Sequence, residues 1–193
     1  MLYESTRDKS CRLTSMEAIK QGISKEGGLF VPGILPYLGN EELSALAEVD
    51  YSGRARYILK LFLTDYKDED IDRCVAAAYT SGAFPPGVAP VASLYPGLDI
   101  LELWHGPTCA FKDMALRLLP HLMTKSLGKI HAENGALILV ATSGDTGKAA
   151  LEGFRDVKGT RILVFYPQDG VSPMQQRQMC TQEGSNVSVC AVR

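Results

Sequence analysis

The stretch LILVATSGDTGKAALEGF, residues 137–154, joins a compact apolar run to a helix-forming segment through a short polar turn. Two more apolar runs follow at residues 160–167 and 186–192, with a helical segment at 172–184 between them. Strands that alternate with helices indicate βαβ units and a parallel sheet. Nearly continuous apolar strands are typical of sheets that are covered on both faces. The sequence therefore predicts an α/β fold whose parallel sheet carries the polar turn at its edge.

The first 90 residues have a different pattern, in which helical periodicity dominates. Thr14 and Glu17 have the spacing of a capping box at the start of a helix, and Gly22 is suited to end that helix. Acidic residues open a later helical segment, where they favour a helix N-terminus. We expect a mostly helical N-terminal domain over residues 1–90.

A change of pattern marks the boundary of the second domain. Residues 83–90, AFPPGVAP, are dense in proline and glycine, as in a linker. A strand candidate at residues 98–104 follows, and then an apolar helix over 113–128 that Pro120 is expected to kink. The α/β domain is therefore expected to occupy residues 91–193.

The composition argues against several classes of protein. The 193 residues carry a formal net charge of −2 with acidic and basic residues interleaved, so no electrostatic footprint for nucleic acid is expected. No run of 18 apolar residues exists, and the polar start of the chain shows no secretion signal. The five cysteines are scattered without a C-x-x-C pair, which predicts reduced thiols and no metal site. We expect a cytoplasmic protein that binds neither nucleic acid nor membranes.

The polar turn, residues 143–147 (SGDTG), has the composition of an anion site. Ligands of open parallel sheets bind at the carboxyl ends of strands, and a helix N-terminus attracts negative charge. Gly144 and Gly147 allow close approach of the backbone, while Ser143 and Thr146 supply hydroxyl donors. Asp145 is the exception, because an acid in an anion site requires a partner of its own. The alternative is that Asp145 or Thr146 only caps the helix.

A second motif, HGPTCAFKD at residues 105–113, places Lys112 directly before an apolar helix. Lysine is seldom buried without a partner, so Lys112 either reaches solvent or is held for chemistry. Positive potential at nearby helix N-termini should lower its pKa, and a neutral amine is what imine formation with an aldehyde requires. Cys109 is interpreted as a small packing residue rather than a nucleophile. Together the two motifs suggest an imine-forming lysine beside a carboxylate-binding loop.

These motifs resemble those of the threonine synthase family, pyridoxal-phosphate enzymes of the tryptophan-synthase-β fold type, also called fold type II. The resemblance rests on HGPTCAFKD, TSGDTG and VSPMQQRQM, and on YESTRD and GGLFVP nearer the N-terminus. It covers essentially the whole chain. It implies that Lys112 binds pyridoxal 5'-phosphate covalently, that Phe111 packs beside this cofactor and that Asp145 approaches its ring oxygen. It further implies that four residues of the turn hold the substrate carboxylate: Ser143, Gly144, Thr146 and Gly147.

Other assignments from the resemblance stay open. His105 and Thr108 are expected either to shape the site or to act as structural hydrogen-bonding residues. The segment Ser5–Thr6–Arg7 could contact a substrate phosphate, although an arginine near a chain terminus is usually solvated. Lys148, at the start of the helix, is either exposed or assists in binding an anion.

The resemblance implies a lyase of threonine biosynthesis that converts O-phospho-L-homoserine and water to L-threonine and phosphate. Family members are much longer than this chain, so we expect it to be an N-terminal fragment with an incomplete cofactor pocket. Such a fragment is expected to be inactive and to self-associate through exposed apolar surface. Two alternatives remain: a related phospho-lyase or dehydratase, and a truncated chain that binds ligands without turnover.

Overall fold

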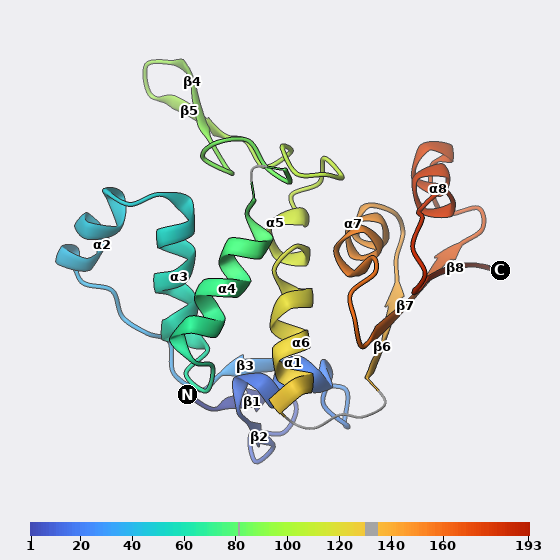
Figure 1. Ribbon diagram of the computed structural model, residues 1–193, viewed down its shortest axis with the longest axis horizontal. Coiled ribbons are helices and arrows are strands. Elements are labelled where there is room, and N and C mark those ends of the chain that lie inside the picture. Colours follow the sequence, from blue (N-terminus) through green and yellow to red (C-terminus); the bar gives the residue numbers. More distant parts are fainter. Residues whose placement is uncertain (81, 130–134) are drawn as a thin grey trace.

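The computed structural model describes residues 1–193 except residues 81 and 130–134. Helices, a small antiparallel sheet and a parallel sheet with its covering helices lie side by side (Figure 1). This arrangement confirms the α/β fold that the sequence predicts. None of the helices in the described ranges is long and apolar enough to cross a membrane.

The N-terminus forms a three-stranded antiparallel sheet that the sequence does not predict. Its strands are β1 (Tyr3–Ser5), β2 (Arg12–Leu13) and β3 (Phe30–Pro32), in the order β2-β1-β3. Strands of two and three residues are too short to show an alternating pattern. Between β2 and β3 lies α1 (Ser15–Gln21), which has the capping box of Thr14 and Glu17 and ends at Gly22, as the spacing predicts.

Three further helices follow in the N-terminal region. They are α2 (Asn40–Ala47), α3 (Tyr51–Phe62) and α4 (Asp68–Ala78). Asp50 caps α3 by accepting a hydrogen bond from the Gly53 N–H at 2.7 Å. A core of buried side chains joins α1 and α4 to α6 (Leu119–Lys129), and its members are Met16, Leu63, Tyr66, Ile71, Cys74, Val75, Ala78, Leu118 and Leu122.

The strand expected at residues 98–104 lies outside the parallel sheet. Strand β5 (Leu98–Leu101) pairs antiparallel with β4 (Val91–Tyr95), and the two form a hairpin that projects from the rest of the molecule (Figure 1). Gly97 supplies the positive φ of 88° that the tight turn between them requires.

The apolar segment after Lys112 is divided into two helices instead of forming one kinked helix. Helix α5 (Asp113–Leu116) is a single turn, and α6 starts at Leu119 with Pro120 as its second residue. Proline is tolerated in the first turn of a helix, where the missing N–H would have no partner inside the helix. The break therefore precedes the proline.

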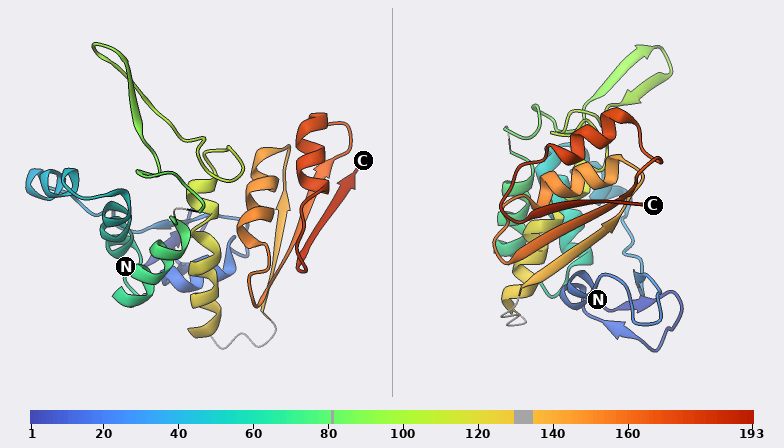
Figure 2. Two further views of the ribbon diagram at one scale, coloured as in Figure 1. Left: turned by 45° about the horizontal axis from the view of Figure 1, so that its top comes forward. Right: turned by 90° about the vertical axis from the view of Figure 1, so that its right-hand side faces the viewer.

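The parallel sheet consists of β6 (Ala136–Ala141), β7 (Thr160–Pro167) and β8 (Val187–Val192), with β7 in the centre. Helices α7 (Asp145–Phe154) and α8 (Pro173–Cys180) cover one face of the sheet (Figure 2, right). The opposite face carries Leu137 and Leu139, which are 59% and 62% exposed. The expectation of burial on both faces is therefore wrong for this chain, because its two crossover helices lie on the same face.

Candidate functional site

Two loops bring the residues singled out in the sequence to one edge of the molecule. The lysine loop, residues 105–112, leads into α5, and the glycine loop, residues 142–147, follows the carboxyl end of β6 and starts α7. Helices α5 and α7 pack against each other (Figure 1). Their contact is close, because a Cβ on Gly153 of α7 would overlap the carbonyl oxygen of Leu116 in α5. The two motifs, far apart in sequence, therefore lie on neighbouring helices.

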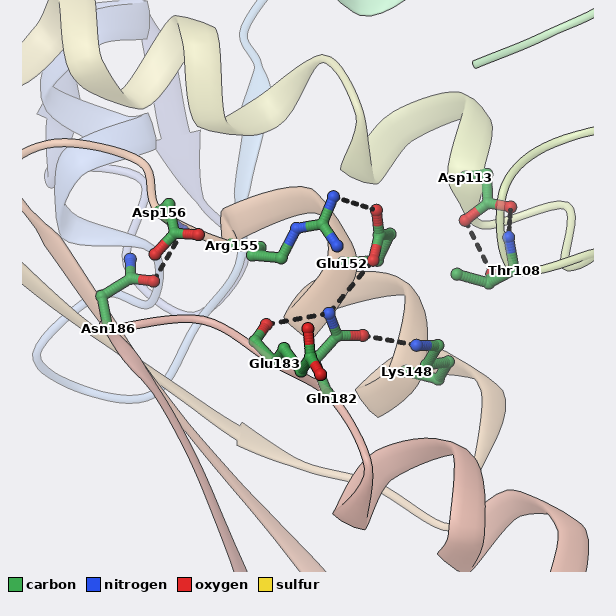
Figure 3. Close-up of polar contacts among 9 residues, drawn as sticks. All are labelled: Thr108, Asp113, Lys148, Glu152, Arg155, Asp156, Gln182, Glu183 and Asn186. Atoms are coloured by element: carbon green, nitrogen blue, oxygen red, sulfur yellow. Dashed lines mark hydrogen bonds and ion pairs between the residues drawn. The ribbon is translucent and has the colours of Figure 1, made fainter. Parts of the chain in front are cut away.

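A buried carboxylate holds the lysine loop in shape. Asp113, 1% exposed, accepts hydrogen bonds from the N–H of Thr108 at 2.8 Å and from its hydroxyl at 2.7 Å (Figure 3). A Cβ on Gly106 would overlap Asp113 Oδ2, so the loop needs glycine there. A buried charge is costly unless it receives hydrogen bonds, and Thr108 provides two of them. Thr108 and Asp113 thus fix the backbone that carries Lys112.

Lys112 stands at the start of α5 with helical backbone angles, φ −62° and ψ −21°. Its side chain is half-buried, and its Nζ lies 4.2 Å from the centroid of the exposed Phe111 ring. Within the described ranges, this amine has no hydrogen-bond or ion-pair partner. The amine is therefore left available beside an aromatic ring, partly exposed to solvent.

The glycine loop is organised by Thr142, a residue that the sequence analysis did not select. Thr142 Oγ1 accepts hydrogen bonds from the N–H groups of Gly144 at 3.1 Å and Gly147 at 3.2 Å. Both glycines are buried, and a Cβ on Gly147 would overlap Thr142 Cγ2 and lie 2.9 Å from Met179 Sδ. The two glycines therefore serve close packing, and Thr142 already binds their N–H groups.

The other members of the glycine loop face solvent. The side chains of Ser143, Asp145 and Thr146 are exposed. Asp145 and Thr146 form the first turn of α7, where backbone N–H groups have no acceptor inside the helix. Hydroxyl donors and helix N–H groups at one place suit an anion, and the partial positive charge of the helix N-terminus adds to the attraction.

Asp145 has a hydrogen-bond partner of its own, which is a neutral amide. Its Oδ1 accepts a hydrogen bond from Gln175 Nε2 at 2.9 Å. Gln175 belongs to the first turn of α8, where Ser172 and Gln175 form a capping box. Asp145 does not cap α7, whose N-cap position is Gly144 without a side-chain hydrogen bond.

The remaining sequence candidates have structural contacts. His105 Nε2 lies 2.5 Å from Glu102 Oε2, which joins the end of the hairpin to the lysine loop. Ser5 is 1% exposed and its hydroxyl lies 3.0 Å from that of Ser24. Hydrogen bonds from the Ser5 and Ser24 hydroxyls lower the pKa of Glu26. Arg7 donates to the Glu26 carbonyl at 3.0 Å.

The segment that contains Ser5 and Arg7 lies away from the lysine loop. Strand β1 is at the opposite end of α6 from α5 (Figure 1). The structure therefore does not bring this segment together with the two loops.

Lys148 takes part in a polar network along α7. It donates to Gln182 Oε1, while Gln182 Nε2 donates to Glu152 at 3.1 Å and Glu152 pairs with Arg155 at 3.3 Å (Figure 3). This network joins α7 to the segment after α8. It explains Lys148 as a residue that stabilises the fold.

Comparisons with known proteins show what the chain is similar to. Residues 2–79 match the family model "Threonine synthase N terminus". The chain is 37% identical over 193 residues to the threonine synthase of Serratia marcescens and 34% identical to that of Escherichia coli. Each alignment covers 100% of this chain and 42% of the relative. The chain therefore spans about two fifths of the length of these relatives.

Solved structures give the same result. The crystal structure of PLP-bound threonine synthase from Brucella melitensis superposes with a TM-score of 0.88 and 37% identity, covering 99% of this chain and 41% of that one. Threonine synthase from yeast superposes with a TM-score of 0.87 and 32% identity, covering 98% and 40%. Similarity in both sequence and fold thus extends through both loops.

Proposed function

We propose that this chain, which is similar in sequence and fold to the N-terminal part of threonine synthases, carries the reactive lysine and the carboxylate-binding loop of such an enzyme. The reaction is the conversion of O-phospho-L-homoserine and water to L-threonine and phosphate. The observation that carries the proposal is the packing of α5 on α7, because the lysine loop leads into the first of these helices and the glycine loop starts the second.

The residues present fit pyridoxal 5'-phosphate. An aldehyde cofactor requires a primary amine without a competing partner, and Lys112 offers one beside the Phe111 ring. Asp145 offers a carboxylate to a protonated ring oxygen, with Gln175 as its neighbour. When bound, the cofactor supplies an electron sink for bonds at the substrate α-carbon. Lys112, Phe111 and Asp145 are the residues that would hold it.

The chain's own groups then have distinct tasks. The hydroxyls of Ser143 and Thr146, with the free N–H groups of the first turn of α7, bind the substrate carboxylate. Gly144 and Gly147 keep that turn close to the sheet. Lys112 would hold the cofactor through Nζ, and its amine would move protons between substrate carbons. The same proposal includes a small-molecule substrate. It also includes a boundary between two domains near residue 90 and a cytoplasmic location.

A related dehydratase or phospho-lyase is the second candidate. It would use the same lysine and the same loop. The match of residues 2–79 to the N-terminal model of threonine synthases supports the synthase over this alternative. Product analysis with O-phospho-L-homoserine, using the protein from the complete coding sequence, distinguishes the two by the release of L-threonine or of a 2-oxo acid.

Covalent labelling tests the proposal. The protein is mixed with pyridoxal phosphate and reduced with borohydride, and the modified lysine is mapped by mass spectrometry. We expect the label at Lys112 and its loss in Lys112→Ala. Lys148→Ala is the matched control, because Lys148 lies at the same edge but is bound to Gln182, and it should keep the label. Labelling at another lysine in wild-type protein would contradict the proposal.

A further inference from the structure

The amide of Gln175 uses both of its ends. Its Oε1 accepts a hydrogen bond from the Ser172 N–H at 3.1 Å, which completes the capping box of α8. Its Nε2 donates to Asp145 Oδ1 at 2.9 Å. The cap fixes which end of the amide is oxygen, so the nitrogen must face Asp145. One side chain therefore links the start of α8 to the first residue of α7.

The same amide lies against the backbone of the glycine loop. A Cβ on Gly144 would overlap Gln175 Nε2 and lie 2.5 Å from Cδ. Gly144 also has a φ of 151°, a conformation that favours glycine. Any side chain at residue 144 would push Gln175 away from Asp145. Glycine at residue 144 therefore allows both the close contact with the Gln175 side chain and the backbone conformation of the turn.

Asp145 needs such a partner because its side chain is exposed. An exposed carboxylate is free to adopt several rotamers, whereas one that accepts a fixed hydrogen bond is held in a single orientation. The donor is neutral, so it orients the carboxylate without pairing its charge. The second carboxylate oxygen stays available to a ligand.

We propose that Gln175 is a positioning residue of this site, which holds the Asp145 carboxylate toward the cofactor through a hydrogen bond whose direction the α8 cap fixes. This inference rests on the proposed function, because it concerns the role of Asp145 in holding the cofactor. Gln175 acts through Asp145 and does not itself contact the cofactor.

Two variants separate orientation from helix capping. Gln175→Glu keeps the capping box, in which glutamate is as suitable as glutamine, but it replaces the donor to Asp145 by a carboxylate that repels it. Ser172→Ala removes the hydroxyl that caps the Gln175 N–H, but it keeps the Ser172 N–H that holds Gln175 Oε1, so the amide nitrogen stays beside Asp145. We expect Gln175→Glu to weaken cofactor binding about tenfold and to move the absorbance maximum of the bound cofactor, with little change in melting temperature. Ser172→Ala should lower the melting temperature by about 2–4 °C and leave the absorbance unchanged.

The exchange Asp145→Asn with Gln175→Glu provides a rescue, since it restores one amide and one carboxylate across the same contact. It should recover part of the cofactor affinity that Gln175→Glu loses. Unchanged affinity and absorbance in Gln175→Glu would overturn the inference while labelling at Lys112 still supports the proposed function.

A measurement without cofactor tests the contact itself. The melting temperatures of Asp145→Ala, Gln175→Ala and the double variant form a cycle, in which coupled residues are not additive. We expect the change in melting temperature of the double variant to differ from the sum of the two single changes by about 1–3 °C. Strict additivity would overturn the inference whatever the cofactor does. Absence of label at Lys112 in wild-type protein would remove the proposed function, and the inference with it.

Discussion

The lysine loop, together with the adjoining Asp113, and the glycine loop contain the same three residue types, threonine, aspartate and glycine, but use them in opposite ways. Directly after the lysine loop, Asp113 is buried and accepts both hydrogen bonds from Thr108. In the glycine loop the aspartate, Asp145, is exposed, and Thr142 accepts the backbone hydrogen bonds. Each loop therefore has one side chain that fixes its shape, and only the hydrogen bonds of the folded protein show which one it is.

This difference indicates how function is divided between the loops. A buried, fully hydrogen-bonded carboxylate stabilises the fold and offers nothing to a ligand. An exposed carboxylate with one weak partner contributes little to stability and is open to a ligand. Mutations in the two loops should therefore separate stability from binding.

The largest effect is expected from Asp113→Ala. The variant leaves the Thr108 N–H and hydroxyl without their acceptor, which should destabilise the protein by about 3 kcal/mol. For a chain of this size that lowers the melting temperature by about 6–12 °C. Asp145→Ala is the matched control and should cost less than about 1 kcal/mol. Equal losses for the two variants in thermal unfolding would remove the distinction between the loops.

The next effect concerns space rather than charge. Gly147→Ala forces a methyl group against Thr142 and Met179, and overpacking of this kind costs about 1–3 kcal/mol. Gly128→Ala is the control, because a Cβ at this helical position meets nothing within 4 Å among the described residues and should stabilise α6 by about 0.5–1 kcal/mol. Chemical denaturation of both variants checks the opposite signs.

A smaller effect, on binding alone, is expected from Ser143→Ala and Thr146→Ala. Each removes a hydroxyl that, in the proposed site, donates to the substrate carboxylate, so we expect substrate binding to weaken about tenfold while the melting temperature stays within about 1–2 °C of wild type. Thr124→Ala on the exposed side of α6 serves as the control. Calorimetric titration with O-phospho-L-homoserine measures the change. If both variants keep wild-type affinity, the glycine loop does not bind the substrate carboxylate and only forms the start of α7.

The smallest effect is expected on self-association, which depends on how well the elements next to each loop are covered. The lysine loop leads into helices that are packed in the core, whereas the sheet behind the glycine loop exposes Leu137 and Leu139. We predict that the 193-residue chain self-associates through this face. Leu139→Ser should shift the distribution toward monomer in sedimentation velocity. Leu43→Ser, at a 50% exposed leucine on α2, should leave it unchanged. A chain that is monomeric at about 100 μM would contradict this prediction.

The sequence predicts the parallel sheet well, because β6, β7 and β8 are apolar runs separated by helices and each lies within a residue or two of its predicted range. It does not predict β1–β3, whose pairing depends on contacts between distant short segments. The hairpin of β4 and β5 is local, and it is missed because the sequence analysis assigns no strand to residues 91–95 with which β5 could pair.

The candidate site shows the same limit. Lys112 and residues 143–147 are visible as motifs, and their roles stay predictions. Thr142 and Asp113 stand at the ends of the quoted motifs TSGDTG and HGPTCAFKD, yet only the folded loops show that they hold the backbone. Gln175 could not be selected at all, because its contact with Asp145 spans 30 residues.

The contact of Gly153 with Leu116 has a consequence for variant libraries. A methyl group at residue 153 would widen the gap between α5 and α7 and so change the distance from Lys112 to the glycine loop. Gly153 touches neither loop, and a library limited to ligand-contacting positions would omit it. A saturation scan scored by cofactor labelling should nevertheless rank this position with the site residues. The distance between the lysine loop and the glycine loop therefore depends on Gly153, which lies in neither loop.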